Sequence, residues 1–150
     1  MNRFHRILHP TDFSRASGAA FKRAVDMAKA NRAKLLLIHV MSPAALYYVS
    51  PQIYAGIEAS ARTDGQKLLN ALAGKAKKAG VRCKTLLVDG IPHERIVRAA
   101  RSTRADLVVI GTHGRSGFAK VMLGSVASRV VASATCPVLT VREKQVSGTR

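Results

Sequence analysis

Glycine and serine residues at a fixed spacing are the part of this sequence that could hold an anion. Gly111-Thr112-His113-Gly114 is followed by nine residues and then by Gly124-Ser125. Glycines let backbone N–H groups approach an anion, and a helix N-terminus adds oriented N–H groups with a partial positive charge. Gly111 closes an apolar run of strand length, and Ser125 is the predicted N-cap of the next helix. The segment could therefore hold a polyphosphate, although its spacing matches neither the Walker loop nor the dinucleotide fingerprint. Simple turns are the alternative, since glycines after a strand commonly form them.

A second candidate segment, Pro10-Thr11-Asp12-Phe13-Ser14, follows the short apolar run Ile7-Leu8. Ligands of open α/β sheets bind at the carboxyl ends of strands, where the strand order reverses. If the first strand is central, this turn lies beside Gly111, and Asp12 could accept hydrogen bonds from a ribose or from backbone groups. An Asx-turn or a helix cap is an equally good interpretation of Asp12. In the glycine segment, His113 could touch a phosphate or remain a solvated side chain.

Apolar runs and segments with helical periodicity alternate along the chain. The strands and helices that they predict must position the two candidate segments. Continuous runs at 35–40, 107–110 and 138–141 are typical of parallel strands covered on both faces. The segment 81–88 begins by alternating, which favours a strand at a sheet edge. Segments with a period of about 3.6 residues lie between the runs. The order β-α-β-α-β-α-β-α-β predicts an α/β fold with a mainly parallel sheet.

Single residues predict where the helices begin and end. Ser14 is the expected N-cap of the first helix, and Pro92 is the expected first residue of the third. The second helix has an apolar face over 57–76, and Gly80 stands where its C-terminal cap belongs. The stretch 42–54 shows no clear period, so we predict a loop there.

Over nearly its whole length the chain resembles the universal stress protein family. The resemblance rests on residues 7–14, 37–40, 106–111, 111–117 and 135–142. The nucleotide motif of that family reads G-x2-G-x9-G-[ST], and this chain fits it in full with Gly111, Gly114, Gly124 and Ser125.

The resemblance implies an open five-stranded parallel sheet of order 3-2-1-4-5, with helices on both faces. It also implies an ATP site, with or without Mg²⁺. Val40 would meet the adenine through its backbone, with Pro10 and Thr11 beside it, and Asp12 and Gly111 would hold the ribose region. The residues expected around the phosphates are Gly114, Arg115, Gly124, Ser125 and Val126. The usual role of the family is regulatory, in survival under stress, rather than metabolic turnover.

A catalytic apparatus for phosphoryl transfer is not evident in the sequence. Such transfer needs a metal, a cationic clamp and a positioned nucleophile. Asp12 is the one obvious carboxylate near the expected site, and Arg115 and Lys120 could clamp phosphates without occupying a Walker lysine position. We therefore expect ATP to be held with slow or no hydrolysis, and a weak ATPase is the alternative.

Length and composition bound the class of protein. The 150 residues suffice for one domain, 1–150, and with 47% apolar residues the chain can bury a core. The two cysteines lie far apart, with no C-x-x-C and no His/Cys cluster, which disfavours a disulfide framework or a structural zinc site. No apolar run approaches the roughly 18–20 residues that cross a bilayer. A single-domain cytoplasmic protein is the resulting expectation.

The charge balance predicts an anionic partner. Lys and Arg number 25 against 8 Asp and Glu, a formal net charge of +17, whereas a magnitude of about 2–8 is usual for a small domain. Basic residues crowd the stretch 62–104, where solvated helix faces account for many of them. The alternative function is therefore a basic module that binds nucleic acid or another anionic surface and leaves its nucleotide pocket unused. The three tyrosines lie away from that stretch, which disfavours a binder that stacks single-stranded bases.

The last apolar run, 138–141, predicts self-association. The strand order implied by the resemblance places this run at a sheet edge, and it carries no charge between Pro137 and Arg142. Unpaired N–H and C=O groups on such an edge invite pairing with another chain. Family members commonly pair this strand with its symmetry mate, so we expect a homodimer through Val138–Val141.

Overall fold

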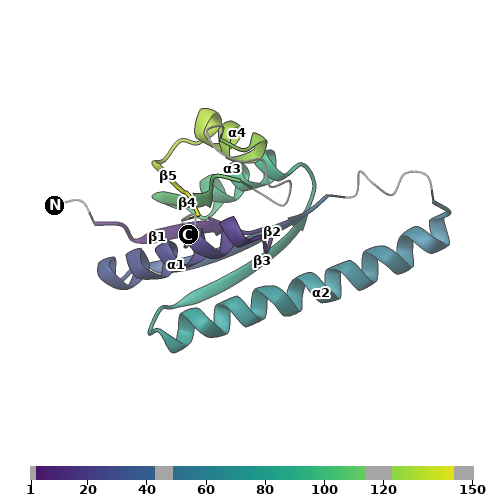
Figure 1. Cartoon of the computed structure of the whole chain (residues 1–150), viewed down its shortest axis with the longest axis horizontal. Helices are drawn as coiled ribbons and strands as arrows, with labels where there is room; N and C mark the ends of the chain where they lie inside the picture. Colours follow the sequence, from purple (N-terminus) through teal and green to yellow (C-terminus); the bar gives the residue numbers. More distant parts are fainter. Residues whose placement is uncertain (1–2, 43–48, 114–122, 144–150) are drawn as a thin grey trace, which may run out of the picture.

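The protein is described here by a computed structural model that covers residues 3–42, 49–113 and 123–143. Strands and helices alternate throughout (Figure 1). The strands are β1 (Arg6–Pro10), β2 (Lys34–Met41), β3 (Cys83–Asp89), β4 (Leu107–Gly111) and β5 (Val138–Val141). The helices are α1 (Arg15–Asn31), α2 (Pro51–Lys78), α3 (Pro92–Ser102) and α4 (Ser125–Ser133). In these parts of the chain no helix is long and apolar enough to span a membrane.

All five strands run parallel in one sheet of order β3-β2-β1-β4-β5. The predicted fold class and strand order are therefore confirmed. β1 is central, as the argument for a site beside Gly111 required. β3 and β5 form the two edges, which confirms the edge position expected for the segment 81–88 and for the last apolar run.

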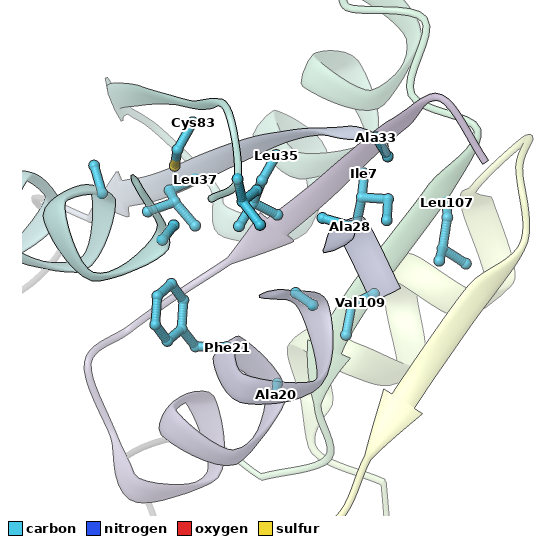
Figure 2. Close-up of a cluster of buried hydrophobic side chains, with 14 of the residues drawn as sticks. Ile7, Ala20, Phe21, Ala28, Ala33, Leu35, Leu37, Cys83, Leu107 and Val109 are labelled. Carbon is cyan, nitrogen blue, oxygen red and sulfur yellow. The ribbon is translucent and has the colours of Figure 1, made fainter. Parts of the chain in front are cut away.

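Two apolar cores cover the two faces of the sheet. On one face Ile7, Leu35 and Val109 pack against α1 and α2, with Phe21 and Ala20 of α1 directed at the strands (Figure 2). On the other face Leu8 and Val108 pack against α3 and α4. Successive residues of a strand point to opposite faces, so a continuous apolar run can supply both cores.

Most of the predicted helix ends are correct. The hydroxyl of Ser14 accepts a hydrogen bond from the Ser17 N–H at 3.2 Å, and Pro92 is the first residue of α3. Gly80 adopts a φ of +87° just after the cap of α2, a conformation that favours glycine. The N–H of Gly80 then bonds to Lys77, which closes the helix as the sequence predicted.

Two predicted boundaries are wrong. α2 begins at Pro51, inside the stretch predicted as a loop, because Ser50 accepts a hydrogen bond from Ile53 N–H and proline fits the first helical turn. Residues 43–48 of that stretch lie outside the described residues. At α4 the N-cap is Gly124, and Ser125 is the first helical residue. The reason is the close approach of Gly124 to the carbonyl of Thr112, which accepts its N–H.

Candidate functional site

A cavity of about 270 Å³ opens at the carboxyl ends of the central strands. The paired register of β1 and β4 ends at Leu8 and Val108, whereas that of β1 and β2 continues to Pro10 and Ile38. The N–H of Thr11 extends the second ladder by bonding to the Ile38 carbonyl at 2.9 Å. β1 thus remains paired with β2 after its pairing with β4 has ended. The crevice forms between β1 and β4, where the strand order reverses.

The cavity brings together every predicted site residue that the structure describes. These residues are Pro10, Thr11, Asp12, Val40, Gly111, His113, Gly124, Ser125 and Val126. They come from three strand ends and from the start of α4, so segments more than 100 residues apart share one wall. Gly114 and Arg115, the other two predicted residues, and Lys120 lie outside the described residues.

The turn after β1 holds Asp12 through several hydrogen bonds. Asp12 Oδ1 accepts the backbone N–H of Ser14 at 2.9 Å and the hydroxyl of Ser17 at 2.8 Å. The Thr11 hydroxyl accepts the N–H of Phe13, which has a φ of 63°. The Asx-turn interpretation of Asp12 is therefore correct. It is compatible with a ligand role, because the same bonds fix the carboxylate at the cavity wall.

Close backbone contacts account for the two motif glycines that the structure describes. A Cβ on Gly111 would lie 2.9 Å from the Ala16 carbonyl oxygen, so glycine lets α1 pack directly on the end of β4. A Cβ on Gly124 would lie 2.8 Å from the carbonyl oxygen of Thr112. Sequence reasoning attributed both glycines to the approach of a phosphate. In the structure, their first role is to let the protein backbone close on itself around the cavity.

Two helices begin at the cavity without a side-chain cap. The N-cap of α4 is Gly124, which has no side chain, and the N-cap of α3 is Ile91, which cannot accept a hydrogen bond. α1 and α2, in contrast, are capped by Ser14 and Ser50. First-turn N–H groups without a side-chain acceptor are the groups that an anion binds. The start of α4 also contains no acidic residue, so nothing there repels a phosphate.

Two histidines, His9 of β1 and His39 of β2, form hydrogen bonds to backbone carbonyls next to the turn after β1. His39 Nδ1 lies 2.8 Å from the Thr11 carbonyl oxygen, and its ring packs at a tilt against Phe13 with 4.6 Å between the ring centroids. His9 is fully buried, with Nδ1 2.8 Å from the carbonyl oxygen of Val109. Burial lowers the pKa of His9 to about 4, so the ring is neutral at pH 7 and Nδ1 donates to the carbonyl. His9 thereby joins β1 to β4 just beyond the last pair of their ladder.

His113 is half-buried rather than solvated. Its Nδ1 lies 3.0 Å from the Thr112 hydroxyl, and its Nε2 is buried with no hydrogen-bond partner among the described residues. The solvated interpretation of His113 is therefore wrong. Thr112 and His113, which follow β4, both line the cavity.

Sequence reasoning missed part of the wall. Pro92 and Ile96 of α3, Ile110 of β4 and Ala127 of α4 supply apolar surface, and Ser17 and Thr112 supply hydroxyls. The position of Pro92 directly after β3 could have indicated its place, because the start of each α/β helix lies at the same end of the sheet. No group of three or more His, Cys, Asp or Glu side chains suited to a metal occurs within 3–42, 49–113 and 123–143.

Comparison with known proteins places this chain among characterised sequences. A model of the universal stress protein family matches residues 3–142. A universal stress protein of Methanocaldococcus jannaschii is 36% identical over 149 residues, which cover 95% of this chain and 84% of that protein. The solved structure of another protein of that organism, MJ0577, has a TM-score of 0.87 at 26% identity and covers 96% of this chain and 99% of that one. A universal stress protein solved in complex with cAMP has a TM-score of 0.68 and 30% identity, covering 94% of this chain and 98% of that one.

Proposed function

The chain belongs to the universal stress protein family, and we propose that it is an ATP-binding regulatory member that acts in survival under stress. The observation that carries the proposal is the uncapped start of α4 at the cavity, with Gly124 and Ser125 in its wall. A relative solved in complex with cAMP supports an adenine nucleotide as the class of ligand.

The two kinds of wall in the cavity suit the two ends of a nucleotide. Ile38, Ile96 and Ile110 form an apolar part, next to the backbone of Val40, where a base would be held. Asp12 and Gly111 would lie at the ribose. Backbone N–H groups at the start of α4 would meet the phosphates, together with Gly114 and Arg115 from the motif.

A magnesium ion would depend largely on the nucleotide itself. Mg²⁺ in nucleotide sites is commonly held by one or two carboxylates and by the phosphates of the substrate. In the described part of the cavity wall, Asp12 is the carboxylate, and its Oδ1 accepts hydrogen bonds from Ser14 and Ser17. This arrangement supports holding of ATP with slow or no hydrolysis. Turnover above background that disappears in Asp12→Ala would instead support an ATPase.

Calorimetry with ATP, in the presence and absence of MgCl₂, tests the proposal. We expect saturable binding with one nucleotide per chain. The affinities of ADP, AMP and cAMP in the same assay, compared with that of ATP, would show how many phosphates contribute to binding. Mass spectrometry of nucleotide released on denaturing freshly purified protein would identify the ligand held in the cell. Absence of saturable binding at millimolar ATP would overturn the proposal.

A homodimer through β5 is the proposed assembly. β5 is an edge strand, and the Val141 carbonyl accepts a hydrogen bond from Thr112 N–H on the β4 side. Since backbone groups alternate along a strand, Thr140 directs its N–H to the open edge. Thr140→Pro removes that donor without interrupting the ladder to β4, so we expect monomers by light scattering. A wild-type chain that is monomeric at tens of micromolar would contradict the dimer.

A further inference from the structure

Four cations form a basic row at the amino end of the sheet, opposite the cavity: Arg6, Lys34, Arg82 and Lys84. Arg6 of β1 is the register partner of Lys34 of β2. Arg82 directly precedes β3, and its carbonyl accepts the N–H of Leu35, the residue after Lys34. Lys84 lies two residues further along β3, on the same face of the sheet as Lys34, because alternate residues of a strand share a face.

The members of the basic row repel one another. Contact with Lys84 is the main cause that lowers the pKa of Lys34, and the charges of Arg82 and Arg6 lower it further. Like charges on adjacent strands destabilise a sheet. A contribution to the stability of the sheet therefore does not explain why these four cations lie together.

Carboxylates do not compensate this repulsion. In the described part of the chain the ion pairs involve Arg15 and Arg62, and no side chain of the basic row forms an ion pair with a carboxylate. Asp106, which lies at this end of the sheet, accepts the backbone N–H groups of His5 and Arg6 at 2.8 and 3.1 Å. The carboxylate of Asp106 thus accepts hydrogen bonds from the backbone at the start of β1 rather than from a side chain of the basic row.

Other basic residues at this end have a structural reason that the basic row lacks. Lys29, Lys75, Lys77, Lys78 and Arg101 occupy the last turns of α1, α2 and α3. There a cation stabilises the helix, because it faces the negative end of the helix dipole. Strands have only small net dipoles, so this effect does not extend to Arg6, Lys34 and Lys84.

We propose that the basic row is a docking surface for the phosphate backbone of double-stranded nucleic acid, separate from the ATP site. Neighbouring strands lie about 4.8 Å apart, so the row extends over roughly 10 Å across three strands. Long, flexible side chains on that scale can follow the phosphates of one strand of a duplex. A bound duplex would replace the mutual repulsion of the four cations by attraction. Contacts of this type hold the backbone without reading sequence.

The surroundings of the row favour a duplex over a membrane or a single strand. Among the described residues the exposed large apolar side chains belong to helices or to the loops beside them, and none belongs to β1, β2 or β3: Val49, Ile53, Ile57, Leu68, Ile91 and Val131. A surface that enters a bilayer normally combines cations with such side chains. Phe4, the phenylalanine nearest to the row in sequence, is half-buried and packs on the core, so less of its ring is left for a base to stack on.

Fluorescence anisotropy with a labelled 30-base-pair duplex of arbitrary sequence tests the proposal in the full-length protein. One variant combines Arg6→Gln, Lys34→Gln, Arg82→Gln and Lys84→Gln. The matched control combines Lys22→Gln, Arg23→Gln, Lys67→Gln and Arg129→Gln, which removes two lysines and two arginines that are exposed on helices. Both variants lose four charges, so only the position of those charges distinguishes them.

We expect the wild-type affinity to fall steeply with added salt. The row variant should bind at least tenfold more weakly at 50 mM salt, with a slope of log affinity against log salt lower by about 3–4, since each lost phosphate contact reduces it by about one. The control should retain most of both. Gly124→Ala should leave duplex binding unchanged, which separates this result from the fate of the ATP proposal.

Three results would overturn the proposal. The first is a wild-type protein that does not bind the duplex at 50 mM salt. The second is equal weakening of the row variant and the control, which would mean that net charge alone acts. The third is preferential binding to vesicles with anionic lipids, or to single-stranded nucleic acid, lost in the row variant. A thermal melt at least as high as that of wild type shows that the row variant is folded.

Discussion

The two ends of this sheet offer positive charge to an anion in different ways. At the carboxyl end the charge comes from backbone N–H groups at the start of α4, which lies in the wall of a cavity. At the amino end it comes from the side chains of Arg6, Lys34, Arg82 and Lys84, which form no ion pair with a carboxylate among the described residues. Fixed dipoles in a cavity select a small ligand by its shape. Flexible cations on a surface suit a polymer whose charges repeat.

The hydrogen bond between His9 and the Val109 carbonyl joins β1 to β4 between the two ends of the sheet. We expect acid to weaken this contact more than any other contact discussed here. The pKa of His9 is about 4 in the fold against an ordinary value of 6.5. The folded pKa is depressed, so the neutral ring stabilises the fold fully above pH 6.5, and this stability is lost as the pH falls towards 4. At pH 4.5 most of this contribution is lost, on the order of 2–3 kcal/mol in the free energy of unfolding.

Denaturant unfolding of wild type and His9→Gln at pH 7 and pH 4.5 measures this loss. The variant should be less sensitive to acid by about that amount, because glutamine has no charge to acquire and its amide can still donate to the Val109 carbonyl. An equal loss in both proteins would mean that groups other than His9 determine acid stability.

Gly124 allows the carboxyl end to be disrupted alone. In Gly124→Ala the new Cβ would lie 2.8 Å from the Thr112 carbonyl oxygen, so the start of α4 must shift. We expect ATP affinity to fall at least tenfold by calorimetry, because the N–H groups at the phosphates shift with the helix. Gly18→Ala in α1 is the matched control, since a Cβ there meets nothing within 4 Å. A Gly124→Ala protein that binds ATP as wild type does would show that the α4 start does not hold the phosphates.

The sequence predicted the carboxyl end better than the amino end, and the reason is physical. Glycines and turn residues are selected by the local backbone conformation that they allow. The candidate site could therefore be recognised from two short segments of sequence, Pro10 to Ser14 and Gly111 to Ser125. The basic row joins residues from three strands, and only the register brings Arg6 and Lys34 next to Arg82. From the sequence alone, the excess of basic residues could be assigned only to the stretch 62–104 and not to this row.

The misassigned start of α2 has a related cause. Between Pro51 and Asp64 none of the side chains of the helix is buried. Without burial there is no selection for an apolar stripe, so the periodicity that indicates a helix is weak. The cap formed by Ser50 and Pro51 was the remaining local indication of the helix start.

Asp12 gives a finer test of the carboxyl end. Asp12→Asn retains Oδ1 as an acceptor for Ser14 and Ser17, so the turn should persist while the charge is lost. Hydrogen bonds to a charged group are worth about 1 kcal/mol more than neutral ones, so we expect a threefold to tenfold loss of ATP affinity. Asp12→Ala, which also removes the turn contacts, should lose more. Equal affinity in wild type and Asp12→Asn would show that the carboxylate does not contact the nucleotide.

The smallest effect that we expect is a gain in stability at the amino end. Lys84→Gln removes the main contact that lowers the pKa of Lys34, so repulsion across β2 and β3 falls and the melting temperature should rise. The rise should shrink in 0.5 M NaCl, because salt screens exposed charges. Lys67→Gln, at an exposed position of α2 that belongs to no such row, should change the melting temperature less. Repeated with bound duplex, the comparison should change sign, since Lys84 would then contribute attraction. A Lys84→Gln protein that melts below wild type without nucleic acid would show that the basic row stabilises the fold, and the argument that the row exists for a partner would fail.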